Sequence, residues 1–90
     1  MSEFVGEIGQ RFAASIVVKS YIWRKGWGSF PRIWLLQDTS GNILTIRSNL
    51  KFKIGQEWIF DGLVKSHRLF NGQKQTHVID WGLILKGRKI

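Results

Sequence analysis

The sequence contains no cysteine, which excludes disulfide bonds and thiolate metal sites but leaves the redox compartment open. A single proline and a hydrophobic fraction of 43% argue against a disordered chain and for a folded one. Long apolar runs are missing as well, because the longest, such as Ile16-Val17-Val18, are far too short to cross a membrane. The first residues lack the basic and apolar regions of a signal peptide, so we expect a cytoplasmic location.

Acidic residues are also scarce. Six Asp and Glu stand against fourteen Lys and Arg, which gives a net charge of +8 and an isoelectric point near 10.5. No acidic residue lies between Glu7 and Asp38, or between Asp61 and Asp80. An uneven positive field of this kind attracts polyanions, and in a cytoplasm the usual polyanion is nucleic acid. An anionic membrane is the weaker alternative, because no amphipathic basic helix is visible.

What remains is a pattern of short strands. Ninety residues make one small domain, and closed architectures suit a chain that buries only about 60% of its unfolded surface. From Arg11 onward, apolar residues recur at every second position, which predicts a strand with one buried face. That apolar stripe comprises Phe12, Ala14, Ile16, Val18 and Ile22, and the opposite face carries Lys19, Tyr21 and Trp23.

Turn residues divide the rest of the chain into further strands. Glycines and a proline predict a loop over 24–32. The stretch from Asp38 to Asn42 consists of turn-forming residues, and Asn71-Gly72 predicts the centre of a hairpin. The connector 48–56 has room for one helical turn. The predicted strands are Ile33 to Gln37, Ile43 to Arg47, a fourth around Trp58, Phe60 and Val64, and a fifth from Lys74 towards Leu85 that is broken or bulged at Gly82. We expect an all-β domain over 11–85, closed into a barrel that removes exposed edges, with a lead-in at 1–10 and a basic tail at 86–90.

The order of these pieces resembles the OB-fold. The stretch from Trp34 to Ile43 matches the hairpin between the second and third OB strands, and the stretch from Ile54 to Lys65 looks like the Gly-rich fourth strand. The stretch from His67 to Thr76 is similar to a hairpin in OB domains of phage and mobile-element proteins. This resemblance implies a five-stranded Greek-key barrel that binds oligonucleotides on its strand 2–3 face, between the loops joining strands 1–2 and 4–5.

Binding of single strands needs cations along the backbone path and aromatic faces on which bases stack. Trp27, which lies between two glycines in a loop, and Phe70, at the hairpin tip, are the predicted stacking platforms; packing of either ring against its own loop is the alternative. Trp34 and Trp58 are assigned to the core, and Trp81 stays undecided. The predicted nucleic-acid-binding residues are Lys19, Tyr21, Trp23, Arg24, Lys25, Trp27, Arg32, Arg47, Lys65, Arg68, Phe70 and Lys74.

Catalysis finds little support in the sequence. His67 and His77 flank the hairpin without cysteines or many acids nearby, so they are interpreted as hydrogen-bonding surface or rim residues and not as metal ligands. The stretch Gly26-Trp27-Gly28 lacks the strand-to-helix context of a phosphate-binding loop. We therefore expect no enzyme activity, no cofactor and no metal.

The leading hypothesis is a protein that binds single-stranded DNA without sequence preference and acts in DNA replication or recombination. Its expected partners beyond DNA are a helicase, a polymerase or a recombinase, and the oligomeric state stays open. Two alternatives remain. One is an RNA-binding OB module, which the 2′-OH of RNA would distinguish. The other is a protein–protein adaptor in a replication or recombination assembly, with the aromatic residues forming a subunit interface.

Overall fold

The computed structural model describes residues 2–23, 32–48 and 50–86, without the side chains of Trp23, Ile84, Leu85 and Lys86. The described residues form five strands and no helix. The strands are β1 (Arg11–Trp23), β2 (Arg32–Asp38), β3 (Ile43–Arg47), β4 (Glu57–Phe70) and β5 (Gln73–Lys86). The predicted third strand has the observed bounds, and the predicted second strand is one residue short at each end.

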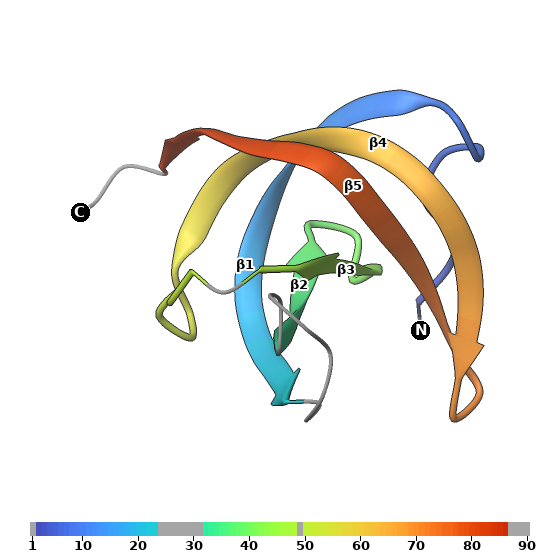
Figure 1. Cartoon of the computed structure of the whole chain (residues 1–90), viewed down its shortest axis with the longest axis horizontal. Coiled ribbons are helices and arrows are strands. Elements are labelled where there is room, and N and C mark those ends of the chain that lie inside the picture. The colour runs from blue at the N-terminus through green and yellow to red at the C-terminus, as the bar shows by residue number, and fades with distance from the viewer. Residues whose placement is uncertain (1, 24–31, 49, 87–90) are drawn as a thin grey trace.

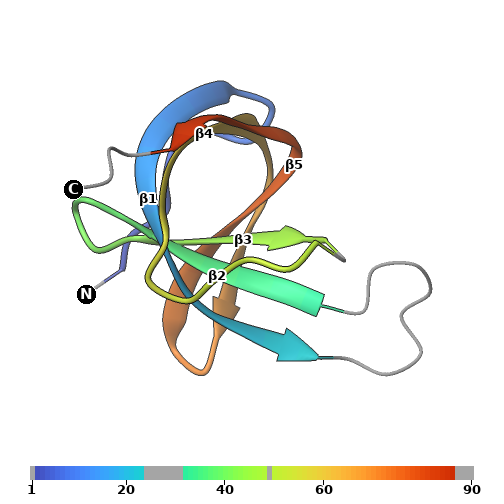
Figure 2. The same ribbon diagram turned by 90° about the vertical axis from the view of Figure 1, so that its left-hand side faces the viewer.

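The five strands close into a barrel in the order β1-β2-β3-β5-β4, with β4 returning to β1 (Figures 1 and 2). Neighbouring strands are antiparallel except for β3 and β5, which pair in parallel over the short stretch from Ile43 to Thr45. The predicted fold class is confirmed, because this is an all-β, OB-fold-like barrel of five strands. Figure 2 shows β1 and β2 extending together beyond the barrel as a two-stranded ribbon.

The core fills the inside of this barrel. Apolar side chains from all five strands meet there because alternate residues of each strand point inward. The fully buried cluster consists of Ile16, Val18, Trp34, Leu36, Leu44, Ile46, Phe60 and Val78. Trp34 is therefore a core residue, as predicted. Trp58 and Trp81 are partly buried and pack against the same cluster.

A bulge in β1 overturns one prediction about its faces. Val18 pairs with Leu36 and Ser20 pairs with Leu35, so Lys19 is an extra residue opposite no partner. Beyond the bulge the two faces exchange. Tyr21 lies opposite the core residue Trp34, and Ile22 lies opposite Ile33 on the outer face. The expectation that Ile22 continues the buried stripe, with Tyr21 on the opposite face, was therefore wrong.

A second bulge lies in β5, next to the predicted position. Asp61 pairs with Gly82 and Leu63 pairs with Ile79, so two β5 residues, Asp80 and Trp81, stand opposite Gly62. Asp80 takes a left-handed backbone conformation there, with φ 50°. Gly62 has no room for a side chain, because a Cβ at this position would overlap Cγ1 of Val78.

The sequence left room for one helical turn in the connector between β3 and β4. Its described residues contain a non-helical turn at Ile54 and Gly55 instead. Gly55 has φ 90° and donates its N–H to the carbonyl oxygen of Val18 over 2.7 Å. Val18 in turn donates to the carbonyl oxygen of Gln56 over 2.9 Å. The connector is thus held against the edge of β1 at the bulge, which fixes the position of Phe52 beside Trp34.

The lead-in is fastened to the back of the β4–β5 hairpin. Ser2 Oγ donates to the carbonyl oxygen of Lys74 over 2.6 Å and accepts a hydrogen bond from the N–H of Ile43 over 2.9 Å. Phe4 stacks on His67 with ring centroids 4.4 Å apart. These contacts cover one face of the hairpin, so its opposite face is the one that remains open.

Candidate nucleic-acid interface

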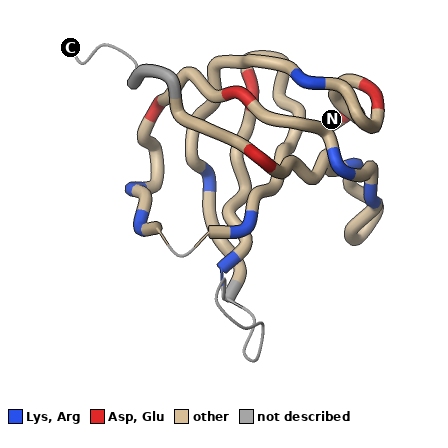
Figure 3. Tube along the Cα trace, turned by 45° about the horizontal axis from the view of Figure 1, so that its top comes forward, with Lys and Arg blue, Asp and Glu red and all other residues tan. Residues whose placement is uncertain are grey.

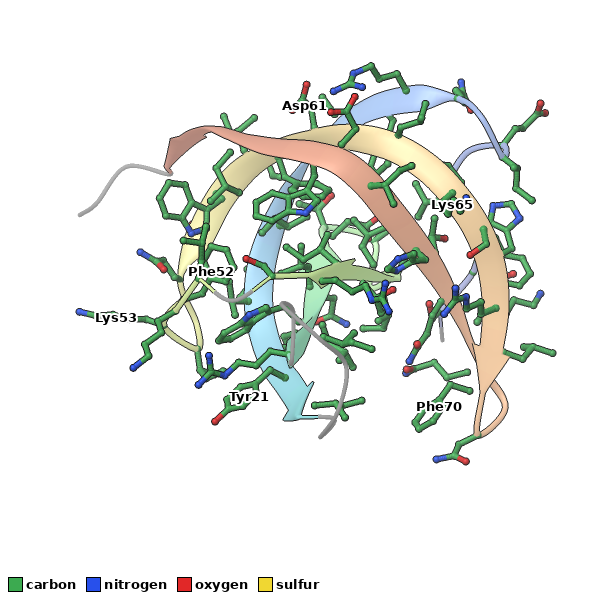
Figure 4. All side chains as sticks on the ribbon, in the orientation of Figure 1. Tyr21, Phe52, Lys53, Asp61, Lys65 and Phe70 are labelled. Carbon is green, nitrogen blue, oxygen red and sulfur yellow. The ribbon has the colours of Figure 1, made fainter. Side chains whose placement is uncertain are left out.

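The open face of the β4–β5 hairpin lies across from the outer face of β2 and β3. The two surfaces enclose two adjoining hollows of about 120 and 330 Å³, which share Arg68 and His77 as lining residues. We call the two together the hairpin groove. Figure 4 shows Lys65 and Phe70, both on β4, on the same side of the barrel, with Phe70 nearer the hairpin tip.

The larger hollow forms the basic half of the groove. It is lined by Arg47 from β3, by Lys65 and Arg68 from β4, and by His77 and Asp80 from β5. A hydrogen bond of 3.1 Å from Arg68 Nε to Ser66 Oγ holds that guanidinium on the groove side of the hairpin. Three cationic side chains from two strands therefore converge on one hollow, which suits a phosphate group.

His77 forms the buried floor between these cations. Its side chain is only 7% exposed, and its Nδ1 lies 3.0 Å from Thr45 Oγ1. Burial, followed by the positive charges of Arg68, Arg47 and Lys65, lowers the pKa of His77 to about 4, against the opposing effect of a hydrogen bond with the backbone of Thr45. The imidazole is therefore neutral at pH 7, and the expectation of a surface or rim residue was wrong for His77.

The smaller hollow forms the apolar half of the groove. Ile22, Ile33 and Leu35 line it from the β1–β2 ribbon, and Phe70 lines it from the hairpin. Phe70 is 44% exposed, so part of its side chain is accessible to a ligand. Thr45 and Gln75, both buried, supply polar atoms between the apolar residues and His77. An apolar floor beside an exposed aromatic ring suits a nucleobase, whereas the adjoining cations suit its phosphate.

Two cations outside the groove, Arg11 and Lys74, are paired with carboxylates, and one of these carboxylates, Asp80, also lines the larger hollow. Arg11 lies 3.6 Å from Asp61 and 3.1 Å from Asp80, and Lys74 lies 2.9 Å from Glu3, so these cations are paired with carboxylates. Figure 3 shows most Asp and Glu positions in the upper part of the view and most Lys and Arg positions below them. The described part of the chain thus separates most of its charges, and the larger hollow of the groove is lined by three basic residues and one acidic residue, Asp80.

The structure brings together only some of the predicted binding residues. Arg47, Lys65, Arg68 and Phe70 line the groove. Tyr21 and Arg32 lie together on the other face of the ribbon, where the guanidinium of Arg32 is 5.3 Å from the Tyr21 ring centroid. Lys19 is exposed at the bulge and lines neither hollow of the groove.

Lys74 does not belong with Arg68, although the sequence places them on the same hairpin. Leu69 pairs with Lys74 and Arg68 pairs with Gln75, so Lys74 and Arg68 point to opposite faces of the hairpin. Lys74 lies against the lead-in, with its Nζ 5.5 Å from the Phe4 ring centroid. The grouping of Lys74 with the groove cations was therefore wrong.

Some predicted residues lie beyond what the structure describes. Trp23 ends β1 opposite Arg32, and its side chain is outside the described part. The predicted contacts at Arg24, Lys25 and Trp27 likewise lie outside the described residues. Their roles stay predictions.

The groove also contains residues that were not predicted to bind, and the smaller hollow alone adds Leu69 and Ile22, Ile33, Leu35, Thr45, Gln75 and His77. One pattern in the sequence identifies the last two. Pairing about a two-residue Asn-Gly turn places Gln75 opposite Arg68 and His77 opposite Ser66, on the face that also carries Phe70. No comparable pattern identifies Ile33 and Leu35, because every residue from Ile33 to Leu36 is apolar and the run has no period.

A further hollow, of about 240 Å³, lies where β1, β2 and β4 meet. Its lining includes Asp38, Glu57 and Trp58, and no Lys or Arg occurs among its described lining residues. This chemistry does not suit a polyanion.

Comparison of the chain with protein-family models, curated proteins and solved structures returned no match. Within the described residues, no helix is long and apolar enough to cross a membrane.

Proposed function

We propose that this protein binds single-stranded nucleic acid, and single-stranded DNA in particular, in the hairpin groove, and that it catalyses no reaction on its ligand. The observation that carries this proposal is the convergence of Arg47, Lys65 and Arg68 beside an apolar floor that ends at the exposed ring of Phe70. Cations beside an accessible aromatic face are the combination that single-strand binding requires.

The same geometry favours unpaired over paired nucleic acid. A base can lie against Phe70 or enter a hollow of about 120 Å³ only when its faces and edges are free of a partner strand. The groove contacts involve side chains that bind phosphates and stack on rings, so we expect little dependence on base sequence. A protein with these properties would act where duplexes are opened, in DNA replication or recombination, beside a helicase, polymerase or recombinase.

The experiment that tests this proposal is a fluorescence anisotropy titration of the full chain with a labelled DNA oligonucleotide, its matched duplex and the same sequence as RNA. Each titration is made at two salt concentrations. We expect single-stranded DNA to bind more tightly than the duplex. With three groove cations and about 0.7 released counterions per phosphate contact, the slope of log K against log salt should be about −2.

Three other results of these titrations would contradict or change the proposal. Equal affinity for the duplex would contradict single-strand binding. Tighter binding of RNA than of DNA would replace the proposed ligand by RNA and point to contacts with the 2′-OH. Absence of binding to all three would leave the adaptor hypothesis, for which Leu69 and Phe70, both exposed at the hairpin end, are the apolar contact residues.

A further inference from the structure

A second aromatic hollow lies on the opposite face of the β1–β2 ribbon from the groove. It has a volume of about 240 Å³ and is lined by Tyr21, Arg32, Trp34, Lys51 and Phe52. In Figure 4, Tyr21, Phe52 and Lys53 lie on one side of the ribbon, and Phe70 and Lys65 lie on the other. The two sites therefore lie on opposite faces of the ribbon that β1 and β2 form.

The three aromatic rings that line this hollow form one packed cluster. Tyr21 and Trp34 have centroids 4.8 Å apart, and the Phe52 ring stands nearly perpendicular to Trp34, with centroids 5.0 Å apart. Tyr21 is 46% exposed, whereas Trp34 is 2% exposed. Trp34 thus packs against Tyr21 and Phe52 packs against Trp34, and Tyr21 keeps about half of its surface exposed where it lines the hollow.

Trp34 also carries a hydrogen-bond donor that the barrel does not use. Its indole N–H is buried and has no hydrogen-bond partner among the described residues. Buried donors are normally paired, and Trp34 is one of the residues that line the hollow, so a ligand there that supplies an acceptor would satisfy this donor. The ring nitrogens and carbonyl oxygens of a nucleobase are acceptors of that kind.

Two cationic residues line the hollow, and a third lies on the connector beside it. The Arg32 guanidinium lies 5.3 Å from the Tyr21 ring centroid, Lys51 lines the hollow, and Lys53 is exposed on the same connector. The ligand that fits aromatic walls, an unused N–H donor and a cationic rim is a flat ring with acceptor atoms and an attached anion.

We propose that this hollow is a second nucleotide site, which takes one base of a single strand against Tyr21 and its phosphate between Arg32 and Lys51. This inference rests on the proposed function, because the same strand would occupy both the groove and this hollow. The nucleic-acid strand would then contact both faces of the β1–β2 ribbon. The distance between the groove and the hollow would set the number of nucleotides in the bound segment.

The test is a nitrogen–proton NMR correlation spectrum of the labelled protein with and without an oligothymidylate of about eight nucleotides, within the range of site sizes of one OB domain. The indole N–H peak of Trp34 reports on the hollow, and the backbone N–H peaks of Thr45 and His77 report on the groove. We expect both groups of peaks to move. Movement of the groove peaks alone would overturn this inference and leave the proposed function intact.

Movement of neither group would contradict the proposed function and this inference together, whereas movement of Trp34 alone would support the hollow and contradict the groove. Anisotropy with variants completes the test. Tyr21→Ala should weaken binding roughly five- to a hundredfold, the range for loss of one stacked base, whereas Tyr21→Phe should restore most of it. Ile54→Ala, on the same connector but outside the hollow, is the control and should bind normally.

If Tyr21→Ala unfolds the protein, Lys51→Glu serves instead, because Lys51 is exposed and its replacement should leave the melting temperature unchanged. We expect this charge reversal to weaken oligothymidylate binding several-fold through lost phosphate contact. Normal binding by a folded Lys51→Glu variant would overturn the inference.

Discussion

The imidazole of His77 and the hydroxyl of Thr45 meet where the barrel closes, with His77 Nδ1 3.0 Å from Thr45 Oγ1. The two residues are partners in the parallel pairing of β3 and β5. The same imidazole forms the floor of the basic half of the hairpin groove, beside Arg47, Lys65 and Arg68. One buried residue therefore connects the closure of the fold with the candidate binding site, and its titration should affect both.

Stability should fall as the pH is lowered through the range in which His77 titrates. Burial and the neighbouring cations lower the pKa of His77 from 6.5 to about 4 in the folded protein. Between these values the unfolded chain binds a proton that the folded chain does not, so protonation favours unfolding. The melting temperature should drop between about pH 6.5 and pH 4, and His77→Gln should reduce this drop. An equal drop in the variant would show that other groups cause it.

Binding of a polyanion should show the opposite dependence on pH. A phosphate placed between Arg47, Lys65 and Arg68 would offset their charges and raise the pKa of His77 towards its ordinary value. The complex would then take up a proton, so affinity should increase as the pH falls from about 6.5 towards 4. Anisotropy titrations of wild type and His77→Gln across this range measure the effect. An identical pH dependence in both proteins would place the phosphate elsewhere.

The bulge opposite Gly62 makes that glycine sensitive to substitution. Gly62→Ala places a Cβ against Val78 and Trp81, and overpacking of this kind costs about 1–3 kcal/mol of unfolding free energy. Gly82→Ala is the matched control, because its Cβ would meet only the Asp61 carboxylate, at 3.2 Å, which can move away. The control should stay within about 1 kcal/mol of wild type in denaturant titrations. A normal stability for Gly62→Ala would show that β5 can shift at this bulge.

Phe70 should contribute to binding and little to stability. Its ring is 44% exposed at the end of the groove, so Phe70→Ala should leave the melting temperature nearly unchanged. Loss of one stacked base should weaken binding of single strands roughly five- to a hundredfold. Phe70→Tyr keeps an aromatic face and should bind within a few-fold of wild type. If Phe70→Ala binds normally but unfolds more easily, the ring only stabilises the hairpin.

The sequence predicted the features that depend on neighbouring residues. The turns at Asp38 and at Asn71-Gly72 follow from local chemistry, since Asp38 Oδ1 accepts the N–H groups of Ser40 and Asn42, and Asn71 and Gly72 have positive φ. Alternation of apolar residues likewise placed Ile16 and Val18 in the core. The class of fold could therefore be predicted from periodicity and turns alone.

The faces of the strands could not all be predicted, because a bulge changes the alternation and depends on the partner strand. The extra residue at Lys19 places Tyr21 opposite Trp34 and turns Ile22 outward into the groove. Nothing in the residues around Lys19 marks this position as a bulge. The buried floor at His77 also depends on the meeting of β3 and β5, which lie far apart in the chain.

The most direct test of the hairpin groove compares two hairpin cations that differ in the face on which they lie. Arg68 lines the groove, whereas Lys74 lies on the opposite face beside Glu3. Neutralisation by Arg68→Gln and by Lys74→Gln removes the same charge from the same hairpin, so any long-range electrostatic effect is shared. The measurement is the affinity of each variant for a single-stranded DNA oligonucleotide as a function of salt, with melting curves recorded alongside. We predict that Arg68→Gln weakens binding and reduces the magnitude of the salt slope by about 0.7, as expected for loss of one phosphate contact, and that Lys74→Gln keeps the wild-type slope. Equal effects of the two variants, or a larger effect of Lys74→Gln, would contradict binding in the groove.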